Sequence, residues 1–140
     1  MQLTFDENLI TGNETIDTQH KELIGRIDAF VRACEMGESK VKAIKMLDYL
    51  EEYTRFHFEA EEKLQKDVNY PELETHQKKH EEFKKTIAVL YEFLEEHEGP
   101  NEQFVELVKT KVIDWLFGHI KTFDRSVAEY IFIVDNPNRL

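Results

Sequence analysis

The sequence of 140 residues is poor in several features that define other classes of protein. Cys34 is the only cysteine, which excludes an internal disulfide and a thiolate metal cluster. Basic residues are outnumbered: 18 Lys and Arg stand against 29 Asp and Glu, and the formal net charge is −11. A surface this acidic repels phosphate backbones and anionic lipids, so we expect neither nucleic-acid binding nor membrane binding.

Long apolar runs and loop-forming residues are also scarce. No apolar run approaches the ~20 residues needed to cross a bilayer. The first seven residues lack the basic and apolar segments of a signal peptide, so we expect a soluble, cytoplasmic protein. With five glycines, three prolines and no Ser/Gly linker, residues 1–140 are interpreted as one domain, and we expect a monomer.

Helical periodicity is the main feature that is present, because apolar residues recur at spacings of three and four. The predicted helices are about 18–36, 39–66, 71–97 and 101–130. The expected boundary residues are Asp17 or Thr18, Gly37, Ser39, Pro71, Gly99-Pro100 and Asn101. Short loops make neighbouring helices antiparallel, so the predicted fold class is all-α, an up-down-up-down four-helix bundle. We expect an irregular N-terminal arm, with Phe5 and Ile10 covering one end of the bundle, and an irregular tail over 131–140.

Polar side chains occupy helix positions that should face the core. They are His20, His57, Glu61, His76, His80 and His119. One buried imidazole is ordinary, but five with a carboxylate would cost several kcal/mol unless each polar group were paired. The sequence therefore raises the question of whether these residues meet.

Helix geometry predicts that they do meet. With alternate helices running up and down at 1.5 Å per residue, these six residues and Asp124 fall within about eight residues of rise, or ~12 Å. His97, the remaining histidine, lands about 25 Å away and is an internal control. Asp124 is the weakest member by spacing, because five residues after His119 it lies about 140° around an ideal helix.

Two pairs are spaced so that both members share one stripe of a helix. His57 and Glu61 are four residues apart, as are His76 and His80. Both members of each pair could therefore coordinate the same metal centre. Glu59 and Glu62 flank Glu61 but point elsewhere, and they are interpreted as solvated surface residues.

Five imidazoles and two carboxylates are too many ligands for one metal and suit a pair of ions. Two six-coordinate ions offer twelve positions, of which five histidines, two bridging carboxylates and one oxo or hydroxo bridge fill eleven. One position stays open for a small molecule. Imidazole and carboxylate ligands without thiolate suit iron, whereas zinc would leave several of them unused.

Four short motifs follow one another along nearly the whole chain. Residues 16–20 read I-D-T-Q-H, 57–61 read H-F-E-A-E, 76–80 read H-Q-K-K-H, and 115–124 read W-L-F-G-H-I-K-T-F-D. They resemble, in the same order, the first-helix motif of the hemerythrin family and its H-F-x-x-E, H-x-x-x-H and W-L-x-x-H-I-x-x-x-D motifs. One departure is Phe5, since many bacterial members carry Trp near the N-terminus.

The resemblance implies a non-haem di-iron centre (Fe²⁺/Fe³⁺) that binds O₂ reversibly at one iron, for storage, delivery or sensing. By motif position, His76, His80 and His119 would ligate the filled iron. His20 and His57 would ligate the open iron, and Glu61 and Asp124 would bridge both.

Apolar residues around these ligands are candidates for the wall of an O₂ pocket, although each also fits an ordinary core. They are Ile24, Phe56, Phe58, Trp115, Leu116 and Phe123. Leu116, one helical turn before His119, is expected to lie nearest the bound O₂, because a dry wall hinders loss of O₂ as peroxide.

Other functions remain open from the sequence. A di-iron oxidase, a peroxidase or an iron-handling protein is the main alternative, but the Glu-x-x-His motif of ferritin-like oxidases is absent. We therefore expect no enzymatic activity. A sensor would need a separate output partner, and a purely structural bundle would not explain why the histidines converge.

Overall fold

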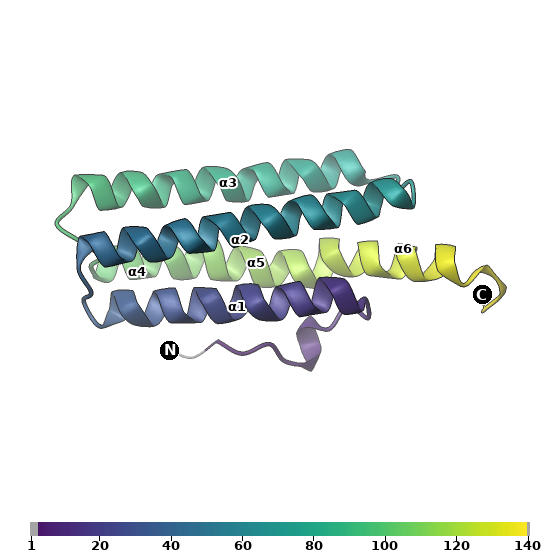
Figure 1. Cartoon of the computed structure of the whole chain (residues 1–140), viewed down its shortest axis with the longest axis horizontal. Coiled ribbons are helices and arrows are strands. Elements are labelled where there is room, and N and C mark those ends of the chain that lie inside the picture. The colour runs from purple at the N-terminus through teal and green to yellow at the C-terminus, as the bar shows by residue number, and fades with distance from the viewer. Residues whose placement is uncertain (1–2, 140) are drawn as a thin grey trace.

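Four long helical stretches run alternately up and down in the computed structural model, which describes residues 3–139 (Figure 1). The first three are α1 (Glu14–Glu35), α2 (Lys40–Asp67) and α3 (Leu73–Glu96). The fourth comprises α4 (Glu102–Val108), α5 (Asp114–His119) and α6 (Arg125–Asp135), joined by π-helical turns at Lys109–Ile113 and Ile120–Asp124. Residues 3–139 contain no strand, and the predicted all-α four-helix bundle is confirmed.

Side-chain caps fix where the helices begin. Ser39 and Asn101 each accept a hydrogen bond from the backbone N–H three residues later, at the two positions where caps were predicted. The first helix differs, because its cap is Asn13 and not Asp17 or Thr18. Asn is as good a cap as Asp, so the earlier polar residue takes the role and lengthens α1 by one turn.

Asp17 instead connects the N-terminal arm to α1 through hydrogen bonds. Its carboxylate accepts hydrogen bonds from the backbone N–H groups of Thr11 and Gly12. Further along α1, Asp28 accepts the backbone N–H of Leu3 at 2.8 Å. The arm, which includes a short 3₁₀ helix at Glu7–Leu9, therefore lies beside α1 (Figure 1) and does not cover one end of the bundle as predicted.

The apolar residues of the arm are only partly those that were predicted. Phe5 is half-buried against the core, but Ile10 is 49 % exposed. Leu9, one position earlier, is the buried residue. The 3₁₀ helix directs Leu9 inward, a local geometry that hydrophobicity alone does not reveal.

The predicted irregular tail over 131–140 is wrong for its first half, because α6 continues to Asp135; residue 140 lies outside the described residues. Ile131 is buried beside Val127 and Ile16, which extends the apolar stripe of the helix by another turn. The helix ends where Pro137 makes the helical conformation unfavourable for Asn136. A short 3₁₀ turn, Pro137–Arg139, follows.

Buried apolar side chains form two separate clusters along the bundle. The larger draws on all four helical stretches, and the smaller contains Ile16, Val127, Ala128 and Ile131. On α1, His20 lies one turn from Ile16 and one turn from Ile24. A layer of polar side chains thus separates two apolar regions of the core.

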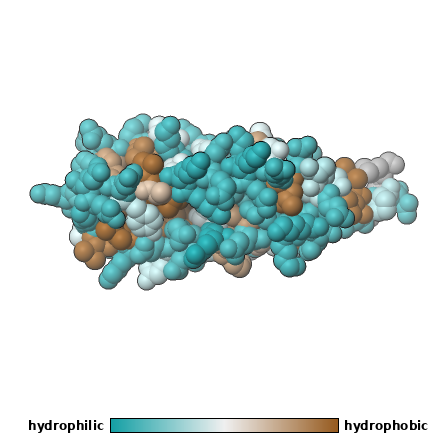
Figure 2. All heavy atoms as spheres, turned by 90° about the horizontal axis from the view of Figure 1, so that it is seen from above, coloured by the Kyte–Doolittle hydropathy of each residue, from teal (hydrophilic) through white to brown (hydrophobic). Residues whose placement is uncertain are grey.

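The outer surface is mostly polar. Figure 2 shows one face on which hydrophilic side chains predominate and apolar ones gather in small separate patches. No helix within residues 3–139 has the length and apolar character needed to span a membrane.

Candidate metal centre

The polar layer contains all seven predicted metal ligands, and they meet at one level of the bundle. None is more than 5 % exposed. They come from every helical stretch: His20 from α1, His57 and Glu61 from α2, His76 and His80 from α3, His119 from α5, and Asp124 from the π-helical turn after it. His97, which was predicted to lie far from these ligands, does not belong to either of the two groups that they form. It stacks on Phe93, and its Nδ1 lies 2.8 Å from the Phe93 carbonyl oxygen.

These side chains form two overlapping groups. Atoms of Glu61, His76, His80, His119 and Asp124 lie within 4.8 Å of one another, as do atoms of His20, His57, Glu61 and Asp124. The two carboxylates belong to both groups, and each histidine belongs to one. This division into three histidines, two histidines and two shared carboxylates is the one that motif position implied.

The distances show how closely the carboxylates approach the histidines. Asp124 has Oδ2 2.8 Å from His20 Nε2 and Oδ1 3.1 Å from His119 Nε2. Glu61 Oε1 lies 2.9 Å from His76 Nε2 and 3.2 Å from His80 Nε2. Asp124 thus reaches toward histidines of both groups.

The position of Asp124 depends on the π-helical turn at Ile120–Asp124. An ordinary α-helix would place Asp124 well away from His119. A π-helical turn closes hydrogen bonds between residues five apart, so such residues lie nearly above one another. The extra residue in this turn therefore brings Asp124 onto the face that carries His119.

Many of these buried atoms lack hydrogen bonds despite their short separations. Within residues 3–139, Nε2 of His20, His57 and His80 and both oxygens of Glu61 and Asp124 have no hydrogen-bond partner. These atoms lie within 4.8 Å of one another in the two groups, but not in hydrogen-bonding geometry. Since each unsatisfied buried polar group costs about 1–3 kcal/mol, this donor set of nitrogen and oxygen fits metal ions that would satisfy all of them together.

The two carboxylates of the layer differ in their electrostatics. Burial, followed by the neighbouring charge of Asp124, raises the pKa of Glu61 well above its usual range. Burial would also raise the pKa of Asp124, but the surrounding His119, His20 and His76 hold it well below its usual range. Two carboxylates this close share one negative charge unless a cation joins them.

Two histidines of the layer, His57 and His119, also resist protonation. Burial lowers the pKa of His57, and the nearby His20 lowers it further. Burial likewise lowers the pKa of His119. Neutral imidazole is the form that binds metals, so the layer presents these two histidines as ready nitrogen donors.

Outside the cluster, three residues that sequence reasoning did not assign to the site contact the outer nitrogens of the histidines. Gln19 Oε1 lies 2.7 Å from His57 Nδ1, and Gln65 Nε2 lies 3.0 Å from His76 Nδ1. The third is Glu62, whose Oε2 lies 2.8 Å from His80 Nδ1, so its interpretation as a solvated surface residue is wrong. Gln65 carried a signal, since it is a polar residue one turn after Glu61 on the core face.

Of the residues predicted to form an apolar wall, some are buried in the core and one is not. Ile24, Phe58 and Leu116 are buried, and Phe58 stacks on His80 with ring centroids 3.8 Å apart. Phe56, by contrast, is 54 % exposed, because it lies two residues from Phe58 and so faces away from the core.

Two further aromatic rings cover His119. Trp115 stacks on it at 4.5 Å and Phe123 at 5.3 Å, and both are half-buried. The Trp115 indole reaches outward to Glu82, with its N–H 3.4 Å from that carboxylate. His119 is thus held between two aromatic faces, which restricts the rotation of its ring.

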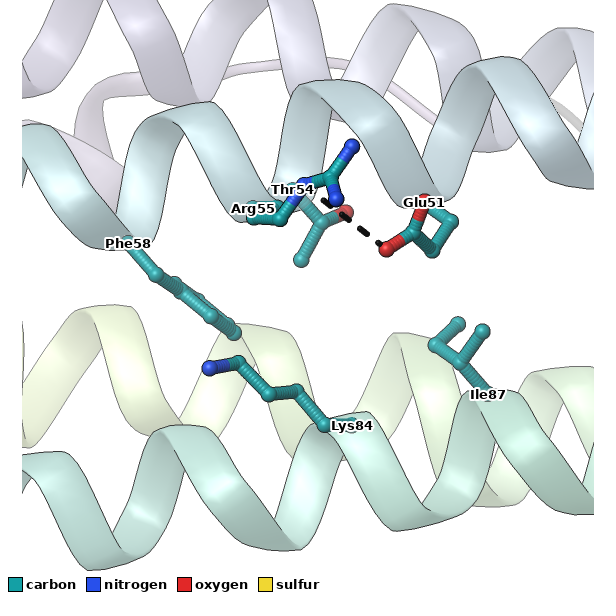
Figure 3. A pocket seen from close by; sticks show the side chains of 6 residues that line it. All are labelled: Glu51, Thr54, Arg55, Phe58, Lys84 and Ile87. Atoms are coloured by element: carbon teal, nitrogen blue, oxygen red, sulfur yellow. Dashed lines mark ion pairs between the residues drawn. The ribbon is translucent and has the colours of Figure 1, made fainter.

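Phe58 also lines a cavity of about 190 Å³ between α2 and α3 (Figure 3). Its other lining residues include the apolar Ile87 and the charged Arg55, Glu51 and Lys84, and Arg55 forms a loose ion pair with Glu51. Because Phe58 also stacks on His80, one aromatic ring contacts both this cavity and the polar layer.

Comparison with known proteins agrees with this geometry. Residues 11–131 match the family model described as the hemerythrin HHE cation binding domain. The chain is 26 % identical to a bacteriohemerythrin of Stenotrophomonas maltophilia and to one of Pseudomonas aeruginosa, over 92 % of this chain and 81 % of each relative. It is 27 % identical to a myohemerythrin of Theromyzon tessulatum, over 86 % of both chains. With a bundle, a donor cluster and a family model that agree over most of its length, this chain belongs to the hemerythrin family.

Proposed function

We propose that this chain holds two iron ions and binds O₂ reversibly, without consuming it, for storage, delivery or sensing. The observation that carries the proposal is the pair of overlapping donor groups that share Glu61 and Asp124. Two shared carboxylates are what a bridged pair of ions requires, and a single ion would leave one group of histidines unused. Binding of O₂ itself needs no protein partner, whereas a sensing role would need a separate output partner.

In this proposal each side chain has a distinct role. His76, His80 and His119 would hold one ion, His20 and His57 the other, and the two carboxylates would bridge them. A pair of iron ions with an oxo or hydroxo bridge would supply the two electrons that reversible O₂ binding requires. The ion held by two histidines would have the smaller ligand set, and it would therefore be the one at which O₂ binds.

The surrounding residues would keep water from that position. Ile24, Phe58 and Leu116 are buried and apolar, and Trp115 closes the layer beside His119. Exclusion of water slows the proton transfers that would release O₂ in reduced form. The apolar wall therefore favours release of O₂ unchanged.

The test is iron analysis combined with absorption spectroscopy. Protein loaded anaerobically with Fe²⁺ should contain two irons per chain and be nearly colourless. O₂ should produce a visible absorption band, and removal of O₂ should abolish it without loss of iron. One iron per chain after saturating supplementation, or continuous O₂ consumption with a reductant and no persistent band, would overturn the proposal; the second result would favour an oxidase.

A matched pair of histidine variants checks the ligand assignment. His57→Ala should lose one iron or release it readily, because His57 belongs to the two-histidine group. His97→Ala should keep both irons and the spectrum, because His97 contacts Phe93 and lies outside both groups. Equal loss of iron from the two variants would contradict the assignment.

A further inference from the structure

The five histidines of the metal centre differ in what their outer nitrogens contact. Nδ1 of His57 and His76 faces the neutral side-chain amides of Gln19 and Gln65. Nδ1 of His20 and His119 has no hydrogen-bond partner within residues 3–139. His80 alone faces a carboxylate, that of Glu62 at 2.8 Å.

Glu62 is held in place on both of its oxygens. While Oε2 accepts from His80, Oε1 accepts a hydrogen bond from the side-chain amide of Gln77 at 3.1 Å. Glu62 lies on α2, whereas Gln77 and His80 lie on α3, so the contact spans two helices. The Glu62 side chain is only 19 % exposed, which reduces its freedom and its screening by water.

A carboxylate and an amide do different things to the histidine they contact. Either can accept the Nδ1 proton, which leaves the Nε2 lone pair free to bind a metal. The Gln65 amide can accept the Nδ1 proton of His76 when the amide is flipped so that its oxygen faces His76. That oxygen has no other hydrogen-bond partner among the described residues. A carboxylate also adds negative charge, so it makes the imidazole a stronger donor to a metal cation.

We propose that Glu62 is a positioning residue that acts through His80 to hold one of the two irons more tightly and to favour its ferric state. This inference rests on the proposed di-iron function. The iron affected is the one bound by His76, His80 and His119. The iron bound by His20 and His57 has only amide support, from Gln19, and leaves first.

The test uses Glu62→Gln, which keeps the shape of the side chain and removes its charge. Glu59→Gln is the matched control, because it makes the same charge change on the same helix at an exposed position. Both variants and the wild type are loaded anaerobically with Fe²⁺, and the release of iron to a strong ferrous chelator is followed. In Glu62→Gln the slower iron should leave about 10–100-fold faster, whereas Glu59→Gln should match the wild type.

A second measurement separates this role from general loss of structure. The reduction potential of the centre should rise in Glu62→Gln, because the ferric state loses the support of a negative charge, and it should not change in Glu59→Gln. If Glu62→Gln does not fold, Gln77→Ala serves instead, since it frees one Glu62 oxygen and should accelerate release in the same direction.

The outcomes distinguish this inference from the proposed function. A wild type that never holds two irons overturns both. A wild type with two irons, together with a Glu62→Gln variant whose slower release and potential are unchanged, overturns only the role of Glu62.

Discussion

The core contains an apolar region and a polar layer that are equally buried but differ in the chemistry of their side chains. At the end of the bundle where α1 gives way to α2, the core is made of apolar side chains such as Phe30, Leu47, Leu94 and Phe104. Toward the other end, a layer of five histidines and two carboxylates replaces them. The apolar region is complete in itself, whereas the polar layer leaves buried nitrogen and oxygen atoms unsatisfied.

The difference separates what stabilises the fold from what gives it a function. Apolar burial contributes roughly 25 cal/mol per Å² wherever it occurs, and it needs no partner of particular chemistry. Buried polar groups cost free energy until each is paired. The bundle thus folds on its apolar regions and bears a destabilising layer, which a bound cation would convert to a stabilising one.

The largest effect is expected in the apolar region. Phe104 is fully buried and packs against Phe30, with ring centroids 6.0 Å apart, and against Phe93 at 5.3 Å. Phe104→Ala should lower the free energy of unfolding by about 3–5 kcal/mol. Urea denaturation should show the same loss with and without iron. A loss confined to the iron-loaded protein would contradict the separation of the two regions.

Leu116 lies at the boundary between the regions, in the larger apolar cluster and one turn before His119. Leu116→Ala should cost about 2–5 kcal/mol in unfolding free energy. If Leu116 forms the wall of the O₂ pocket, the variant should still bind O₂ but autoxidise faster. Stopped-flow spectroscopy measures the decay, and decay at the wild-type rate would remove Leu116 from the pocket.

Within the polar layer, an apolar substitution should have the opposite sign. Glu61 is fully buried, and neither of its carboxylate oxygens has a hydrogen bond within residues 3–139. Glu61→Met should therefore raise the unfolding free energy of the metal-free protein by about 1–3 kcal/mol while reducing its iron content. Thermal denaturation of the apoprotein, paired with iron analysis, tests both parts. A destabilised apoprotein would mean that the layer is already well paired without metal.

The effect that is smallest at neutral pH concerns Cys34, a titratable group inside the apolar region. Burial, and then the charge of Glu35, raises its pKa to about 12. An unfolded thiol titrates near about 8.5, so between these two values the unfolded chain loses a proton that the folded chain keeps. Stability contributed by this group is therefore complete below about pH 8.5 and declines as the pH rises.

The comparison with Cys34→Ala isolates this effect. The decline in unfolding free energy between pH 8 and pH 11 should be steeper for the wild type than for the variant, because the variant lacks the thiol. Native protein should also resist alkylation at pH 8. Parallel pH profiles would show that the thiol ionises equally in both states.

Much of this protein could be predicted from patterns that recur along a helix. Apolar residues at spacings of three and four predicted the helices. Polar residues on the apolar faces of these helices identified six of the seven residues of the polar layer. Helix ends were less predictable, because Asn13 and Asp17 are both good caps and only the contacts of the arm with Asp17 decide between them. The single-domain organisation, the monomeric state and the cytoplasmic location stay predictions.

The sequence by itself determined that four helices form and that their histidines fall at one level, since both follow from the fixed rise and period of an α-helix. Only the tertiary structure decided what departs from that period or crosses between helices. Asp124 joins the layer because a π-helical turn rotates it onto the face of His119. Glu62 contacts His80 because α2 and α3 pack side by side, a relation between residues 18 positions apart that no local pattern encodes.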